Sequence, residues 1–236
     1  MPLHIIGDIH GDFWTLKRLL QDIPKNEPVI QVGDLGIWPA TAARWKSCAI
    51  DRDVHFIDGN HDYIPWLDAD SKELIEIWPH AIYVPRGHVV EFDVGKVLFL
   101  GGSKSVDRAF RRKDSTDHGW FEAEQLTLNQ ATRALARVTA DGPIDYMITH
   151  TPPDSVIRKN FSEEGLKAFG INPKTWVDES ARLVEKVWQA LGMPQLYCGH
   201  MHRKVVEPKV RILDIYEVLC LNTAPPANSS VSLQDQ

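Results

Sequence analysis

Residues 3–10 read LHIIGDIH, a run of apolar residues that stops at an aspartate and a histidine two positions apart. Four further segments repeat this arrangement: PVIQVGD at 28–34, VHFIDGNHD at 54–62, DYMITH at 145–150 and QLYCGHMH at 195–202. Each is a short strand-like run that ends in carboxylate, carboxamide or imidazole groups. Ligands of open α/β sheets bind outside the carboxyl ends of the strands. The five segments therefore predict an α/β fold with a polar site at the carboxyl ends of its strands.

Helical patterns alternate with these strands. Phe13, Leu16, Leu19 and Leu20 recur at helical spacing, which predicts a helix over 13–22 with Asp12 as its N-cap. Further helices are expected at 39–49, 120–138 and 174–191, a strand hairpin at 87–93 and 96–101, a loop at 102–119, and short strands between 204 and 221. Strands that alternate with helices, together with a hairpin, indicate mixed sheets.

The 236 residues show no internal repeat and no long linker, so we expect one domain over 1–225 and a flexible tail over 226–236. With 43% hydrophobic and 25% charged residues, the composition is that of a globular protein. The formal net charge of -6 argues against a surface that coats duplex DNA.

The three cysteines, Cys48, Cys198 and Cys220, are scattered and form no CxxC pair, so we expect no disulfide framework and a reducing, cytoplasmic location. The longest apolar runs, such as VLFL at 97–100, are too short to span a bilayer. No coiled-coil heptads or amphipathic membrane segments are visible, so we expect no membrane association and no obligate protein partner.

The residue types at the strand ends suit a pair of metal ions. Asp8 and His10, two apart on a strand end, point to the same side and can reach one cation. Asp34 has two oxygens that could bridge two ions about 3.5–4 Å apart, the spacing of two-metal hydrolases. Asn60 offers a carbonyl oxygen, while His61 can stay free of metal and donate a proton.

Three further histidines complete the pattern. His150 follows an apolar strand, and His200 and His202 repeat the spacing of Asp8 and His10. Five of the ten histidines fall in these motifs. Taken singly, each motif has a structural explanation as a turn or a hydrogen-bonded side chain. Their joint occurrence at successive strand ends indicates a dinuclear hydrolytic site.

On these motifs, Asp8-Ile-His10, Gly33-Asp34, Gly59-Asn60-His61-Asp62, His150 and Gly199-His200-Met201-His202, the chain resembles the calcineurin-like metallophosphoesterase family. The resemblance spans residues 7–202. It implies a four-layer αββα sandwich of mixed sheets flanked by helices, with a dinuclear metal site at the carboxyl ends of the strands. It also implies two divalent ions, Mn²⁺ foremost, with Fe or Zn²⁺ compatible with mixed oxygen and nitrogen ligands.

The same resemblance implies a role for each motif residue. Asp8, His10 and His202 would hold one metal, Asn60, His150 and His200 the other, and Asp34 would bridge. A hydroxide between the metals would attack phosphorus, and His61 would orient the phosphate or protonate the leaving oxygen. Asp62 is the expected catalytic partner of His61, and Asn60 is also expected to contact the substrate.

The start of the chain, GDIHGDFWTLKRLL, is similar to the protein Ser/Thr phosphatase branch, but the likeness then ends. That branch has an Asp-Arg pair soon after the second motif and an Arg before its GNH. Here the stretches read GDLGIW at 33–38 and IDGN at 57–60. The carboxylate that supports the histidine is therefore missing from its usual place, which leaves Asp62 or Asp58 as candidates.

The loop at 104–113 is the expected source of phosphate-binding cations, because it carries Lys104, Arg108, Arg111, Arg112 and Lys113. Arginine forks match phosphate oxygens. Arg108, Arg111 and Arg112 are the candidates for binding substrate, with Arg108 preferred for its place near the preceding strand. A solvated charged loop is the alternative interpretation.

Tryptophans supply a second set of candidates. Trp14, Trp45 and Trp188 fall within predicted helices and are expected in the core. Trp38 and Trp120 flank motif loops and are candidates for stacking on a base or an aromatic leaving group.

The sequence therefore predicts a cytoplasmic metal-dependent phosphoesterase, with a preference for phosphodiesters or broad specificity because the phosphatase arginines are missing. Its substrate would be a nucleotide, a nucleic-acid end, a small phosphate ester or a phosphoprotein. Two alternatives stay open: a phosphomonoesterase of the Ser/Thr phosphatase type, and a metal-binding scaffold without catalysis.

Overall fold

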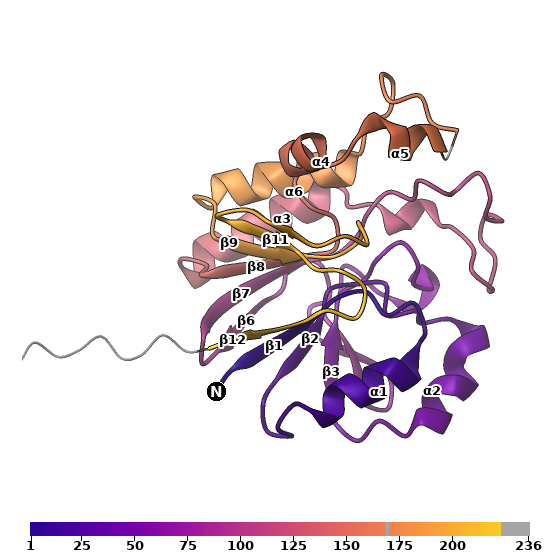
Figure 1. Ribbon diagram of the computed structural model, residues 1–236. Helices are drawn as coiled ribbons and strands as arrows, with labels where there is room; N and C mark the ends of the chain where they lie inside the picture. Colours follow the sequence, from indigo (N-terminus) through magenta and orange to yellow (C-terminus); the bar gives the residue numbers. More distant parts are fainter. Residues whose placement is uncertain (169, 223–236) are drawn as a thin grey trace, which may run out of the picture.

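A computed structural model describes residues 1–168 and 170–222. Two six-stranded mixed sheets lie face to face, with helices on the outer face of each (Figure 1). This arrangement confirms the predicted α/β fold of mixed sheets flanked by helices. The tail predicted at 226–236 lies outside the described residues.

The first sheet has the order β12-β1-β2-β3-β5-β4. Its central strands β1 (Leu3–Ile6), β2 (Val29–Gln31), β3 (Val54–Phe56) and β5 (Ala81–Tyr83) are parallel. The edge strands β12 (Val218–Leu221) and β4 (Ile75–Trp78) are antiparallel to their neighbours. Helices α1 (Phe13–Gln21) and α2 (Ala42–Cys48) cover its outer face.

The second sheet repeats this plan in the order β10-β11-β9-β8-β7-β6. Strands β7 (Gly95–Leu100), β8 (Tyr146–Thr149), β9 (Gln195–Cys198) and β11 (Val210–Ile212) are parallel. Strands β6 (Val89–Phe92) and β10 (Val205–Val206) are its antiparallel edges. Helices α3 (Leu128–Asp141), α4 (Asp154–Asn160) and α6 (Glu179–Ala190) lie outside it, and the short α5 (Glu163–Ala168) buries no residue.

Alternation along the strands divides the core into three layers. In β7, Val97 and Phe99 face the other sheet, whereas Leu98 and Leu100 pack under the outer helices. Leu3 and Ile5 of β1 join the layer between the sheets in the same way. Both faces of each sheet are buried, so the parallel strands are packed on both sides. The loops at their carboxyl ends therefore begin from well-packed strand ends.

Several elements differ from the sequence-based expectation. The helix expected at 120–138 begins only at Leu128, because Thr127 and Gln130 form a capping box there, and Glu122–Glu124 forms a separate 3₁₀ turn, η3. A 3₁₀ turn, η2 (Ile64–Trp66), follows GNHD, and another, η1 (Pro39–Thr41), opens α2. Strands β4 and β5 and helices α4 and α5 were not predicted.

Two tryptophans also differ from expectation. Trp14 is 57% exposed on α1, although a core position was expected, and Trp38 is fully buried, so it cannot stack on a substrate. Within the described ranges, no helix is long and apolar enough to cross a membrane.

Candidate metal centre

The candidate metal ligands come from loops that directly follow five parallel strands. Asp8 and His10 follow β1, Asp34 follows β2, and Asn60 follows β3 in the first sheet. His150 follows β8, and His200 and His202 follow β9 in the second. The carboxyl ends of both sheets thus meet at one edge, and all seven side chains come together there.

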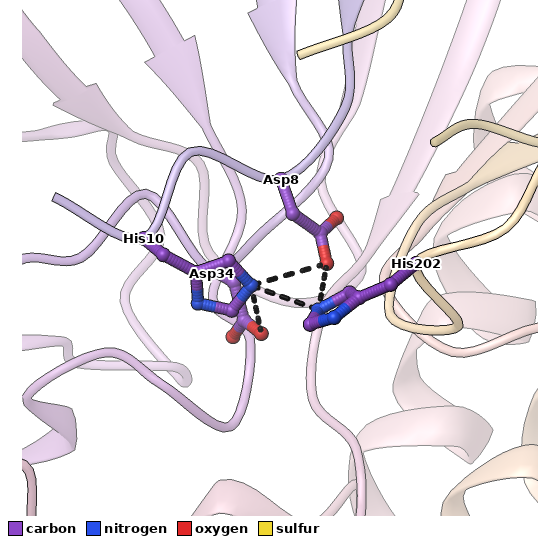
Figure 2. A group of neighbouring side chains, drawn as sticks. All are labelled: Asp8, His10, Asp34 and His202. Carbon is purple, nitrogen blue, oxygen red and sulfur yellow. Dashed lines mark hydrogen bonds and ion pairs between the residues drawn. The ribbon is translucent and has the colours of Figure 1, made fainter. Parts of the chain in front are cut away.

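Asp8, His10, Asp34 and His202 form the first group, with one ligand atom from each within 4.8 Å of the others (Figure 2). His10 Nε2 and His202 Nε2 lie 2.8 Å apart, and His202 Nε2 lies 3.3 Å from Asp8 Oδ2. His10 Nε2 lies 3.8 Å from both Asp8 Oδ2 and Asp34 Oδ2. Two imidazole nitrogens and two carboxylates that converge this way suit one divalent cation.

Asp34, His150 and His200 form the second group, again within 4.8 Å of one another. His150 Nε2 lies 3.4 Å from Asp34 Oδ1 and 3.3 Å from the carboxamide oxygen of Asn60. Its Nδ1 is 2.8 Å from the carbonyl oxygen of Val32, which leaves Nε2 to face the site. Asn60 thereby adds a fourth potential ligand to this group.

Asp34 is the residue that the two groups share. It is fully buried, and its Oδ2 has no hydrogen-bond partner among the described residues. Burial disfavours its charged form, but His150 and the other nearby histidines hold the pKa of Asp34 well below its usual value. A buried carboxylate oxygen without a donor is the group that a bound cation would satisfy.

The pKa values of the two histidines in the second group shift in opposite directions. Burial opposes the charge on His150, but the Asp34 carboxylate outweighs it and raises the pKa of His150 to about 10. Burial, assisted by His150, holds the pKa of His200 well below its usual value. Asp34 thus favours a positive charge beside it, and a cation bound there would displace the proton of His150, because imidazole binds metal in its neutral form.

Four of the candidate ligands adopt left-handed backbone conformations, with φ of 50° at His10, 58° at Asp34, 68° at His200 and 48° at His202. Such conformations are uncommon outside glycine and concentrate at functional sites. Gly59 and Gly199 leave room for the carboxylates, because a Cβ on Gly59 would overlap Asp34 Oδ1. A Cβ on Gly199 would overlap Asp8 Oδ1.

Asp62 ties two of these loops together. Its Oδ1 accepts hydrogen bonds from the amides of Gly36 and Ile37, and its Oδ2 accepts from the amides of Asp34 and Gly59, at 2.8–3.1 Å. Burial and the neighbouring Asp34 raise the pKa of Asp62 to about 7, while these amides oppose the shift. Among the described contacts Asp62 therefore orients backbone, and none of them reaches the His61 ring.

His61 lies beside the first group, with its ring centroid 5.1 Å from that of His10. Its Nδ1 is 3.3 Å from Arg111 Nη1, and its Nε2 is 3.8 Å from Asp107 Oδ2. The indole nitrogen of Trp38 donates to the His61 carbonyl at 2.7 Å, which explains why that tryptophan is buried. The carboxylate nearest the His61 ring is thus Asp107, from the loop between β7 and α3.

Asp58, the other expected partner of His61, is used elsewhere. Its Oδ1 accepts from the Tyr83 hydroxyl at 2.9 Å, and its Oδ2 accepts from Arg86 Nε at 3.0 Å in a buried ion pair. The sequence carried no local signal for Asp107, because this residue reaches His61 only through the fold of a long loop.

The three candidate arginines occupy different places. Arg111 reaches the site: it donates to the Asn60 carbonyl at 3.0 Å and pairs with Asp107 at 3.1 Å and Glu124 at 3.5 Å. Arg108, which the sequence favoured, is exposed and lies over the Trp120 ring at 4.3 Å. Arg112 is exposed as well.

Comparison with protein-family models matches residues 1–204 to the family described as calcineurin-like phosphoesterase. This stretch contains both ligand groups, His61 and the loop that carries Arg111. No curated protein matches the chain.

Proposed function

The chain belongs to the calcineurin-like phosphoesterase family, and from this premise we propose that it is a hydrolase that cleaves phosphate esters with two divalent metal ions. The observation that carries the proposal is the position of Asp34, which both ligand groups share and whose buried Oδ2 accepts no hydrogen bond from the described residues. Asp8, His10 and His202 would complete one site. Asn60, His150 and His200 would complete the other.

Ions bound there would supply Lewis-acid chemistry, lowering the pKa of water and offsetting the charge that builds on the phosphoryl oxygens. Arg111 Nη1 lies 3.3 Å from His61 Nδ1, and arginine can only donate, so a neutral His61 would accept there and carry its proton on Nε2. In this tautomer His61 Nε2–H would donate a hydrogen bond to a phosphate oxygen and orient the ester for attack.

We favour phosphodiesters over phosphomonoesters. A monoester dianion carries more charge than a diester. Binding it requires arginine N–H groups that do not already contact other protein groups. The guanidinium of Arg111 already contacts five protein groups: Asn60, His61, Ser105, Asp107 and Glu124. It therefore has little capacity left for a dianion and acts instead as a positioning residue for His61.

The remaining assignments follow from ligand chemistry. Oxygen and nitrogen donors without thiolate suit Mn²⁺, Fe and Zn²⁺, and the family resemblance favours Mn²⁺ among them. The described cysteines Cys48, Cys198 and Cys220 are free, which supports a reducing, cytoplasmic location.

A paired assay tests the proposal. Metal-stripped protein is given Mn²⁺, and initial rates are compared on bis-p-nitrophenyl phosphate and p-nitrophenyl phosphate. We expect the diester rate to dominate. A dominant monoester rate would favour the Ser/Thr phosphatase type, and two bound metals without hydrolysis of either substrate would favour the scaffold.

A further inference from the structure

The loop between β7 and α3 carries an exposed aromatic side chain between two exposed arginines. Phe110 is 74% exposed, the highest value among the described large hydrophobic residues that are exposed. Arg108 and Arg112, two positions away on either side, are exposed as well. Single exposed apolar side chains are common on protein surfaces, but this one lies between two exposed cations in a protein of net charge -6.

The root of this loop is fixed at the metal centre. The Ser103 hydroxyl donates to the Asn60 carboxamide oxygen at 2.7 Å, and Arg111 lies 3.3 Å from His61 Nδ1. Phe110 directly precedes Arg111 in the chain. The loop projects from the edge of the molecule at which the strands of both sheets end (Figure 1). The exposed side chains therefore belong to a loop that borders the candidate metal centre.

Within the described residues, neither of the two flanking arginines, Arg108 and Arg112, forms an ion pair. Within the residues that the structure describes, the Arg112 side chain makes no hydrogen bond or ion pair. The Arg108 guanidinium lies 4.3 Å from the centroid of Trp120, a contact that leaves its N–H groups available at the edge. Arg111, by contrast, is occupied by protein groups. Arg111 of this loop therefore contacts the candidate site, whereas Arg108 and Arg112 face solvent.

We propose that the outer face of this loop, formed by Arg108, Phe110 and Arg112, binds the single-stranded end of a nucleic acid next to the scissile phosphodiester. Phe110 stacks on an unpaired base, and Arg108 and Arg112 bind the flanking phosphates. This inference rests on the proposed phosphodiesterase function and names its substrate class. A duplex would keep its bases stacked away from Phe110, and a phosphopeptide would use the arginines but not the aromatic face.

The test compares a nucleic acid with a small diester that has no neighbouring nucleotides. Hydrolysis of a short oligothymidylate and of bis-p-nitrophenyl phosphate is measured for wild type, Phe110→Ala and Arg112→Ala with Mn²⁺. Loss of one stacked base predicts that Phe110→Ala raises KM for the oligonucleotide about 5- to 100-fold. We expect kcat/KM for the small diester to change less than about twofold, because the metal centre is untouched.

Matched controls are available on the outer helices. Leu128→Ala removes another apolar side chain, 67% exposed, at the start of α3, and Lys186→Ala removes an exposed cation from α6. Neither should alter KM for either substrate. Arg112→Ala should also reduce the salt dependence of oligonucleotide binding, measured by fluorescence anisotropy, by about one ion.

Different results would overturn different claims. If wild type hydrolyses the small diester but Phe110→Ala leaves the oligonucleotide KM unchanged, the loop inference is wrong and the proposed function stands. A preference for a phosphopeptide over the oligonucleotide would also overturn it. If wild type hydrolyses neither ester, the proposed function fails. In that case the anisotropy assay still tests the loop inference, and equal oligonucleotide affinity of wild type and Phe110→Ala would overturn it.

Discussion

Replacing Gly59 by alanine would force apart two loops of the metal centre. A Cβ built on Gly59 lies 2.5 Å from the Asp34 amide nitrogen and 2.7 Å from Asp34 Cγ, and closer still to Oδ1. Ordinary contacts of a Cβ begin at 3.4 Å, so the Asp34 amide nitrogen must move by about 0.9 Å and Oδ1 by more. The φ angle of Gly59 is not in the left-handed region, so alanine meets no backbone strain there and the effect is steric.

A displacement of about 1 Å at a catalytic site costs roughly 100-fold in rate. Overpacking costs about 1–3 kcal/mol of the free energy of unfolding, or about 2–12 °C in Tm for a chain of this size. We therefore expect Gly59→Ala to remain folded, to bind Mn²⁺ at least tenfold more weakly, and to hydrolyse bis-p-nitrophenyl phosphate about 100-fold more slowly. Calorimetric Mn²⁺ titration, initial rates and thermal unfolding measure the three effects.

Gly165→Ala is the matched control, because a Cβ on this helical glycine meets nothing within 4 Å. It should leave metal binding and rate unchanged and add up to about 1 kcal/mol of stability through helix propensity. Wild-type metal affinity and rate in Gly59→Ala would refute the claim that Gly59 makes room for the Asp34 carboxylate.

Three further substitutions test separate parts of the site and its surroundings. His61→Ala should lower kcat at least 100-fold yet bind metal as wild type, which calorimetry and initial rates distinguish; retained turnover would remove His61 from the chemistry. Burial raises the pKa of Asp178 from 3.8 to about 6, so the wild type loses stability as the pH rises through that range. Asp178→Asn should therefore stabilise the protein by up to about 3 kcal/mol at pH 8 and not at pH 4. Urea unfolding at the two pH values measures the difference. Asp62→Asn should lower the free energy of unfolding by about 2–6 kcal/mol at pH 8, because the carboxamide NH₂ cannot accept hydrogen bonds from two of the four amides that Asp62 binds. This is the opposite of the effect at Asp178, although the pKa of Asp62 is also raised. Equal urea midpoints for Asp62→Asn and wild type would show that these amides do not need the carboxylate.

The strand ends were predictable because ligand residues and strand residues are neighbours in the sequence. The apolar runs before Asp8, Asp34 and His150 are β1, β2 and β8, and the turn residues after each run carry the ligands. Parallel pairing then places these ends at one edge, so the meeting of the motifs follows from the fold class. The N-cap at Asp12 was also local, and it holds, since Asp12 accepts from the Thr15 amide at 3.1 Å.

The surroundings of His61 were not predictable from local pattern. Asp107 and Arg111 reach it from a loop whose path depends on contacts with Glu124, Ser105 and the Asn60 carbonyl. These contacts join residues up to 51 positions apart, as between Arg111 and Asn60. A run of charges gives no indication of which arginine turns inward, so the sequence did not single out Arg111 as the one that contacts His61.

Some errors in the sequence-based predictions have a cause that is visible in the sequence or the structure. The capping box Thr127-x-x-Gln130 was present in the sequence, and it would have placed the start of α3 at Leu128. Trp38 was a candidate for stacking on a substrate because it flanks a motif, whereas its indole donates to the His61 carbonyl and is buried as part of the loop support. Proximity to a motif did not distinguish a residue that supports a loop from one that contacts substrate.

The central claim is that Asp34 joins two metal sites that hydrolyse a phosphate ester together. The most direct measurement is a calorimetric titration of metal-stripped wild type and Asp34→Asn with Mn²⁺, with bis-p-nitrophenyl phosphate hydrolysis followed at each point. We expect wild type to bind two equivalents, with activity that appears as the second site fills, and Asp34→Asn to lose both tight binding and activity. Full activity without metal, or with Asp34→Asn, would contradict it.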